Sequence, residues 1–214
     1  APYSESYRLA MAVTGTAEPQ SWNHKPVEAS FYTLRAVAEK LLRRFGLDIY
    51  ALKSEELKSD LFSEALSLQL NGKELLQIGV VAPKLRKRFD LKQPVYLLEM
   101  NFDLLVKSTK KLRIQAEELS KFPEVKRDLA LLVDKQTTFA QLREVAFQAE
   151  KKLLKRVSLF DVYEGDKLPA GKKSYALSFL LEDKSRTLDD KTIEKVMANI
   201  QRQLEQRCGA SVRS

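Results

Sequence analysis

Five side chains between positions 163 and 194 combine an aromatic ring with charged groups, and these types suit contacts with RNA. They are Tyr163, Lys172, Lys173, Arg186 and Glu194. An aromatic ring can stack on an exposed base, because every base has a π-face, and cationic side chains can neutralise phosphates. A glutamate is an acceptor that could read a base edge. These residues predict binding of a polyanion rather than bond-breaking chemistry.

Each of these residues also has a structural interpretation. Tyr163 could pack against a neighbouring loop, the two lysines could form a solvated hairpin tip, and Glu194 could be an ordinary exposed helical glutamate. For Arg186 we favour a structural role, in which the guanidinium holds its loop through a carboxylate. Two more basic clusters lie at residues 151–156 and 84–88. The first reads as a solvated helix end, and the second fits a subunit contact or RNA backbone equally well.

Motifs that would indicate catalysis or a metal site fail on residue type or spacing. The string Gly171-Lys172-Lys173-Ser174 does not make a phosphate-binding loop, because Asp166 and Lys173 stand where glycine and Ser/Thr are needed. One histidine, His24, and one cysteine, Cys208, cannot build a zinc cage or an intrachain disulfide. The sequence therefore predicts no catalytic residue, no metal ligand and no cofactor bound by this chain.

Composition indicates a globular protein with a basic surface. The chain has 214 residues, of which 44% are hydrophobic and 31% charged, and a net charge of +8. Residues 122–214 hold 18 Lys and Arg against 14 Asp and Glu, and residues 1–121 hold 19 against 15, so each part carries +4. No apolar run reaches the ~18 residues of a membrane-spanning helix. We expect a cytoplasmic protein without a membrane partner.

The elements that must position the candidate residues follow a βαββαβ order after a boundary near Phe122-Pro123. The expected strands are Leu129–Val133, Val157–Tyr163, Ser174–Leu181 and Ala210–Arg213. Thr138 and Gln141 form a capping box for the first helix, and Asp189 is the expected N-cap of the second, which Gly209 ends.

This order predicts a four-stranded sheet with helices on one face and the other face open for binding. Strand alternation puts Phe160 and Val162 on one side and Tyr163 on the other. If the first two residues are core, Tyr163 points outward.

Residues 1–121 predict a second α+β unit. The expected elements are strand Tyr7–Thr14, helix Leu34–Phe45 ended by Gly46, and strands Leu66–Leu70, Leu75–Val81 and Val95–Asn101. Asn71-Gly72 is a strong hairpin signal between two of these strands. A polar, helix-favouring stretch over residues 108–121 separates the two units.

Several spaced motifs resemble one protein family. The sets that carry the resemblance in the second unit are Arg127-Asp128-Leu129-Ala130, Phe160-Asp161-Val162-Tyr163-Glu164-Gly165, Gly171-Lys172-Lys173-Ser174 and Ser185-Arg186-Thr187-Leu188-Asp189-Asp190. In this order they resemble the ferredoxin-like, anticodon-binding domain at the C-terminus of bacterial phenylalanyl-tRNA synthetase β chains. The first unit resembles the catalytic-core-like domain that precedes it, through Phe31-Tyr32, Gly79 with Pro83, and Leu91 with Pro94-Val95-Tyr96.

The resemblance implies an α+β fold made of two domains. Residues 1–121 would form an incomplete, non-catalytic, class II synthetase-like antiparallel domain, and residues 122–214 a ferredoxin-like βαββαβ domain that binds the anticodon. The chain would be a C-terminal fragment of the β subunit, with Tyr163, Lys172, Lys173, Arg186 and Glu194 as its RNA-binding residues.

The parent enzyme implied by the resemblance attaches phenylalanine to its tRNA with ATP and magnesium. It is an α2β2 heterotetramer whose aminoacylation site lies on the α subunit. The fragment would bind phenylalanine tRNA and support subunit assembly without catalysing a reaction. One alternative is an assembly module without direct RNA readout, and another is a small ferredoxin-fold enzyme acting on a phosphorylated metabolite.

Overall fold

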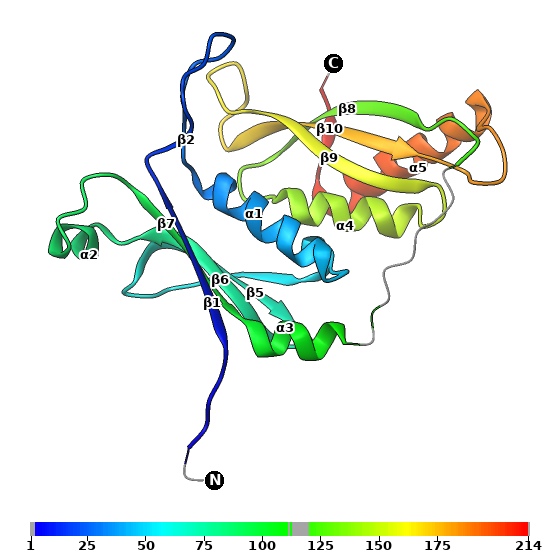
Figure 1. The fold of residues 1–214 in the computed structure, drawn as a ribbon. Helices are drawn as coiled ribbons and strands as arrows, with labels where there is room; N and C mark the ends of the chain where they lie inside the picture. The colour runs from blue at the N-terminus through cyan, green and yellow to red at the C-terminus, as the bar shows by residue number, and fades with distance from the viewer. Residues whose placement is uncertain (1–2, 111, 113–119, 214) are drawn as a thin grey trace. The chain divides into compact units, whose positions relative to one another are not determined.

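The chain forms two compact units, residues 1–116 and 117–214. The computed structural model describes residues 3–110, 112 and 120–213, and Figure 1 shows the elements of each unit. Most of the predicted polar helical stretch over residues 108–121 lies outside the described residues.

The first unit contains a five-stranded antiparallel sheet with the strand order β1-β7-β6-β5-β4. Its strands are β1 (Arg8–Thr14), β4 (Lys53–Glu56), β5 (Phe62–Leu70), β6 (Lys73–Val81) and β7 (Val95–Asn101). Asn71 and Gly72 have φ angles of 52° and 74°. These left-handed conformations suit the predicted two-residue turn, and the hairpin between β5 and β6 is confirmed.

Two helices pack on one face of this sheet. Helix α1 (Phe31–Arg44) begins at a capping box, in which Ser30 and Thr33 bond each other's backbone N–H. It buries Leu34, Ala38 and Leu42, while α3 (Phe102–Thr109) contributes Leu105 to the same core. The sheet supplies Ile78, Leu98 and Met100, which are at most 2% exposed.

Polar side chains that bond one another occupy the other face of this sheet. Glu99 accepts a hydrogen bond from Gln77 at 3.2 Å and forms an ion pair with Arg8 at 3.4 Å. Ser67 donates to Glu74 at 2.8 Å. We call this surface the paired polar face, because the side chains named here already have partners within the unit.

The second unit contains a four-stranded sheet with the strand order β11-β8-β10-β9 and antiparallel pairing throughout. Its elements are β8 (Val125–Asp134), α4 (Phe139–Ala149), β9 (Leu154–Tyr163), β10 (Lys172–Leu181), α5 (Asp190–Cys208) and β11 (Ser211–Val212). The βαββαβ order is that of the ferredoxin-like fold, so the predicted α+β class is confirmed.

Helices α4 and α5 lie together on one side of the second sheet (Figure 1). Leu142 of α4 and Ile200 of α5 are fully buried with Leu131 and Phe179 of the sheet. The predicted caps are confirmed: Thr138 and Gln141 form the capping box of α4, and Asp189 accepts from the Thr192 N–H at 2.7 Å. These caps fix where the loops between strands enter the helices.

The structure adds short elements that the sequence did not predict. They are β2 (Thr16–Glu18), β3 (Val27–Glu28), the 3-10 turn Ile49–Ala51, β4, α2 (Pro83–Arg88) and α3. Each is too short to show a clear period of apolar residues, which explains why pattern reasoning missed them.

Candidate nucleic-acid interface

The candidate site is the face of the second sheet that points away from α4 and α5. Leu131 of β8 pairs with Tyr175 of β10, and both belong to the core beneath the helices. Because side chains alternate along a strand, the neighbouring pair of Ala130 and Ala176 lies on the opposite face. We call this second surface the open face.

Tyr163 lies on the open face, at the end of β9 and opposite Ser174. The guanidinium carbon of Arg213 is 5.3 Å from the centre of its ring, within the range of a cation–π contact. Arg213 directly follows β11, and its N–H donates to the Ala130 carbonyl of β8 at 2.8 Å. The ring is half-buried, so the structure leaves part of it accessible.

The position of the Tyr163 ring requires a glycine at position 165. A Cβ added at this glycine would lie 2.6 Å from the Tyr163 hydroxyl oxygen and 2.8 Å from the ring carbon that bears it. Any larger residue would therefore have to displace the ring. The sequence did not assign a role to Gly165 or Arg213, because neither contact can be derived from spacing along one strand.

The condition that Phe160 belongs to the core is not met, because this residue is 58% exposed. A register shift in the β9–β10 pairing pairs Asp161 with Ala176 and Leu159 with Leu177, which leaves Phe160 as an extra residue. Such a bulge interrupts strict alternation. The Lys126 ammonium lies 5.8 Å from the Phe160 ring centre. Simple alternation could not have revealed this arrangement.

The two hairpin lysines have different environments. The Lys172 ammonium pairs with Asp134 at 2.7 Å, across the β8–β10 register. Lys173 is only 8% exposed, and its ammonium lies 4.6 Å above the ring of Tyr175. Alternation places the two side chains on opposite faces of β10, so they do not form one cationic tip.

Arg186 lies in the loop between β10 and α5, where its Nε is 3.4 Å from Asp183. Asp183 also accepts hydrogen bonds from the Ser185 hydroxyl at 2.6 Å and the Ser185 N–H at 2.9 Å. These bonds, with a smaller effect from Arg186, hold the pKa of Asp183 below its usual range. This network organises the loop, as the structural interpretation of Arg186 requires.

Glu194 is exposed on α5, one turn after the helix begins. Helix α5 packs beneath the sheet, so Glu194 belongs to the helix layer and not to the open face. The structure therefore brings Tyr163 together with Phe160, Lys126 and Arg213, whereas Arg186 and Glu194 lie at the entrance and first turns of α5.

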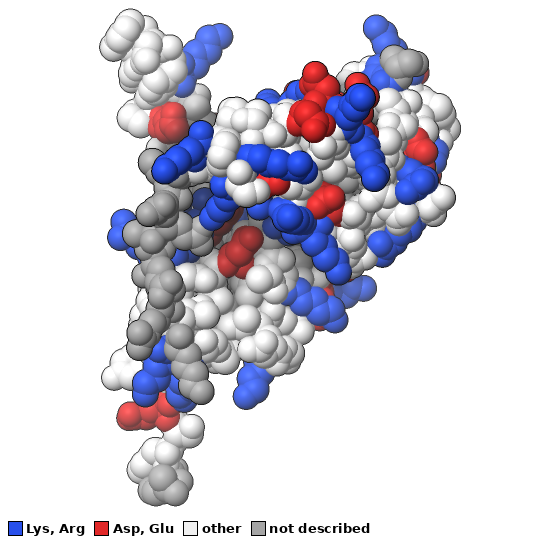
Figure 2. All heavy atoms as spheres, turned by 90° about the vertical axis from the view of Figure 1, so that its right-hand side faces the viewer, with Lys and Arg blue, Asp and Glu red and all other residues white. Residues whose placement is uncertain are grey.

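Charged side chains of both signs are present on the surface. Figure 2 shows many Lys and Arg side chains on one face, with Asp and Glu side chains between them. The basic net charge is thus distributed over the surface in this view and is not confined to one polybasic segment.

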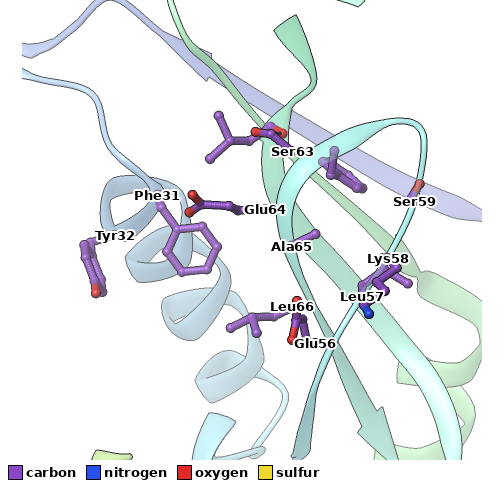
Figure 3. A pocket seen from close by; sticks show the side chains of 12 residues that line it. Phe31, Tyr32, Glu56, Leu57, Lys58, Ser59, Ser63, Glu64, Ala65 and Leu66 are labelled. Carbon is purple, nitrogen blue, oxygen red and sulfur yellow. Dashed lines mark hydrogen bonds between the residues drawn. The ribbon is translucent and has the colours of Figure 1, made fainter. Parts of the chain in front are cut away.

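The first unit contains a cleft of about 620 Å³ between α1 and the strand pair β4–β5 (Figure 3). Phe31 enters it from the first turn of α1, and Glu64 and Leu66 face it from β5. The Ser63 hydroxyl at its edge donates to the Val80 carbonyl at 3.3 Å, so it serves the sheet. The lining lacks the hydrogen-bonded nucleophile and base that would indicate catalysis.

Over the part of the chain that the structure describes, no group of three or more His, Cys, Asp or Glu side chains is placed to hold a metal ion. None of the helices that the structure describes is long and apolar enough to cross a membrane.

Both units resemble known protein families. Residues 120–213 match the family described as Ferredoxin-fold anticodon binding domain, and residues 2–102 match the family described as Phenylalanyl tRNA synthetase beta chain CLM domain. The chain is similar over its whole length to proteins named phenylalanine–tRNA ligase beta subunit. Identity is 48% in Bacteroides fragilis, 47% in Bacteroides thetaiotaomicron and 45% in Porphyromonas gingivalis. The chain spans 26% of the length of each of these relatives.

Proposed function

Because the chain belongs to the phenylalanyl-tRNA synthetase beta chain family, we propose that it is part of a phenylalanine–tRNA ligase and that its second unit binds the anticodon region of phenylalanine tRNA. One observation carries this proposal: the unit that matches an anticodon-binding domain has two accessible aromatic rings on the sheet face away from its helices. Such a face can stack unpaired bases, as related α+β modules do.

Tyr163 is the principal RNA-binding residue in this proposal. Its ring has a cation–π contact with Arg213 and occupies the space beside Gly165. A ring with such neighbours has less rotamer freedom to lose when it binds RNA. Lys172 can bind a phosphate with its ammonium if its ion pair with Asp134 breaks. The Lys173 ammonium contacts the Tyr175 ring within the sheet. It would therefore attract RNA only by its positive charge, without a direct contact.

Arg186 and Glu194 would meet RNA only where it passes the start of α5. Arg186 keeps a 64% exposed side chain although it contacts Asp183, so its remaining donors are available to a phosphate. Glu194 is exposed and could accept from a base amino group. Because Arg186 and Glu194 do not lie on the open face, we propose that they make secondary contacts with the RNA.

The first unit is proposed to support assembly with an α subunit, in an α2β2 enzyme. Its surface carries several large hydrophobic side chains that are exposed in this chain. They include Tyr3, Tyr7, Trp22, Tyr32, Phe89 and Leu91, with exposures between 46% and 97%. Contacts with other parts of the enzyme would bury them.

ATP and magnesium belong, in this proposal, to the aminoacylation site of the α subunit. This chain's own residues are assigned no part in holding either of them. In this proposal both units act by binding.

The proposal is tested by measuring binding of the 214-residue chain to an anticodon stem-loop of phenylalanine tRNA across a salt series. A stem-loop with a scrambled anticodon is the control. We expect tighter binding to the cognate loop, with an affinity that falls by a log–log slope of roughly 0.7 for each neutralised phosphate of the loop. Equal affinity for the two loops would contradict anticodon recognition.

The alternative function, an assembly module without RNA readout, makes a different prediction. Its association with an α subunit would depend on exposed apolar residues such as Tyr32 and would change little with salt. Binding to the α subunit together with failure to bind either stem-loop would favour this alternative.

A further inference from the structure

We propose that Phe160 is a second base-stacking residue, so that the open face holds two bases of a single-stranded loop, one on Phe160 and one on Tyr163. The inference deepens the proposed anticodon binding and rests on it. It starts from the exposure of Phe160: this residue is 58% exposed in the middle of a strand and does not belong to the core of its unit.

The bulge in β9 gives this ring its direction. Strict alternation would put Phe160 on the same side as Val162, which pairs with the core residue Tyr175. The register shift instead inserts Phe160 between the paired residues Leu159 and Asp161. Bulges are frequent next to binding sites because they re-aim a side chain. Here the re-aimed side chain joins Tyr163.

The contact with Lys126 identifies the face that Phe160 occupies. Lys126 shares its side of β8 with Asp128, to which its ammonium lies within 3.8 Å, and alternation puts both opposite the buried Leu131 and Val133. The same ammonium is 5.8 Å from the Phe160 ring centre. Lys126 reaches across β10 to do so, because β10 separates β8 from β9.

The two rings therefore have similar surroundings. Both belong to the edge strand β9, and each has a cation that comes from beyond the neighbouring strand β10. This cation is Lys126 for Phe160 and Arg213 for Tyr163. A cation beside an aromatic ring also lies close to the phosphate of a base stacked there, which adds electrostatic attraction to stacking.

The spacing of the rings determines the conformation of the RNA. Three residues of a strand span roughly 10 Å, and the extra residue of the bulge shortens this span. Successive stacked bases lie only about 3.4 Å apart. Bases on Phe160 and Tyr163 therefore cannot stack on each other, so this face would take two splayed bases of a loop and would not take a duplex.

The test places the fluorescent base 2-aminopurine at single positions of the anticodon stem-loop and measures its quenching by the 214-residue chain. Quenching is expected at two positions. Phe160→Ala should abolish quenching at one position and weaken binding by about 5- to 150-fold, the range for loss of one stacked base, while Phe160→Trp restores both. Tyr163→Ala should abolish quenching at the other position.

Val162→Ala is the matched control. Val162 is exposed like Phe160, at 46%, but it lies on the helix side of the strand. It should leave quenching and affinity unchanged. If Phe160→Ala binds as the parent does while Tyr163→Ala is impaired, the second stacking position is wrong and anticodon binding stands. If the parent chain binds no stem-loop, both proposals fail. Circular dichroism confirms that each variant is folded.

Discussion

Both units place helices on one face of an antiparallel sheet, but the opposite faces differ in chemistry. On the paired polar face of the first unit, Glu99 accepts a hydrogen bond from Gln77 and forms an ion pair with Arg8. These polar side chains therefore already have partners within the unit. On the open face of the second unit, Phe160 and Tyr163 keep accessible rings beside Lys126 and Arg213. A surface whose groups already have partners offers little to a ligand, whereas accessible rings with neighbouring cations can bind one.

The largest expected effect tests whether the two units have independent cores. Phe179→Ala empties a fully buried position of the second unit and should destabilise that unit by about 3–5 kcal/mol. Leu98→Ala, at a fully buried position of the first unit, should cost that unit about 2–5 kcal/mol. Amide hydrogen exchange resolves the two units. Loss of protection in both units after either substitution would show that the cores are coupled.

A second prediction sharpens the role of the open face. Gly165→Ala should lower affinity for the anticodon stem-loop, because its Cβ would displace the Tyr163 ring, and it should hardly change stability. The loss should approach the ~5- to 150-fold expected from removing one stacked base. In a double-mutant cycle, adding Gly165→Ala to Tyr163→Ala should cause no further loss. Additive losses would mean that Gly165 acts elsewhere.

A third prediction concerns the paired polar face. Arg8→Ala removes an ion pair whose side chains are 48% and 36% exposed, so it should cost the first unit at most about 1 kcal/mol. It should leave stem-loop affinity unchanged, apart from the small effect of losing one positive charge. Chemical unfolding and the same binding assay measure the two quantities. A loss of affinity as large as that of Tyr163→Ala would remove the contrast between the faces.

The smallest expected effect is on the pH dependence of stability. Hydrogen bonds from Ser185 and Thr192 hold the pKa values of Asp183 and Asp189 below their usual range. Lowered carboxyl pKa values stabilise the second unit above the unfolded pKa, near 4, and this contribution is lost as pH falls through the lowered values. Asp183→Asn and Asp189→Asn should flatten the acid limb of a urea-unfolding series.

In the first unit, the lowered pKa of Glu55 comes mainly from the exposed Lys53. Added salt should therefore weaken this acid dependence, because it screens exposed charges. The corresponding effect in the second unit should resist salt, since hydrogen bonds to Ser185 and Thr192 dominate there. Equal salt sensitivity in the two units would contradict these causes.

Local patterns in the sequence were sufficient to predict most of the second unit. The capping box at Thr138, the cap at Asp189 and the helix end at Gly209 are all short-range signals, and the structure confirms them. The hairpin at Asn71-Gly72 was predictable for the same reason, because only a few residue types adopt two successive positive φ angles.

The arrangement of the open face was not predictable in the same way. The bulge that exposes Phe160 depends on the pairing of β9 with β10, and the partners Lys126 and Arg213 come from β8 and the end of β11. Spacing along one strand does not contain these contacts. Tyr163 faces away from the helices, but the sequence tied this direction to Phe160 being a core residue, and Phe160 is exposed.

The most direct test of the contrast between the units compares two tyrosines. Tyr163→Ala removes the ring on the open face, and Tyr32→Ala removes a 73% exposed ring from α1 of the first unit. Both variants are titrated with the anticodon stem-loop of phenylalanine tRNA at one salt concentration. We predict that Tyr163→Ala binds about 5- to 150-fold more weakly than the parent chain and that Tyr32→Ala binds as the parent does. Equal affinities for all three proteins, or a loss confined to Tyr32→Ala, would contradict the assignment of RNA binding to the open face.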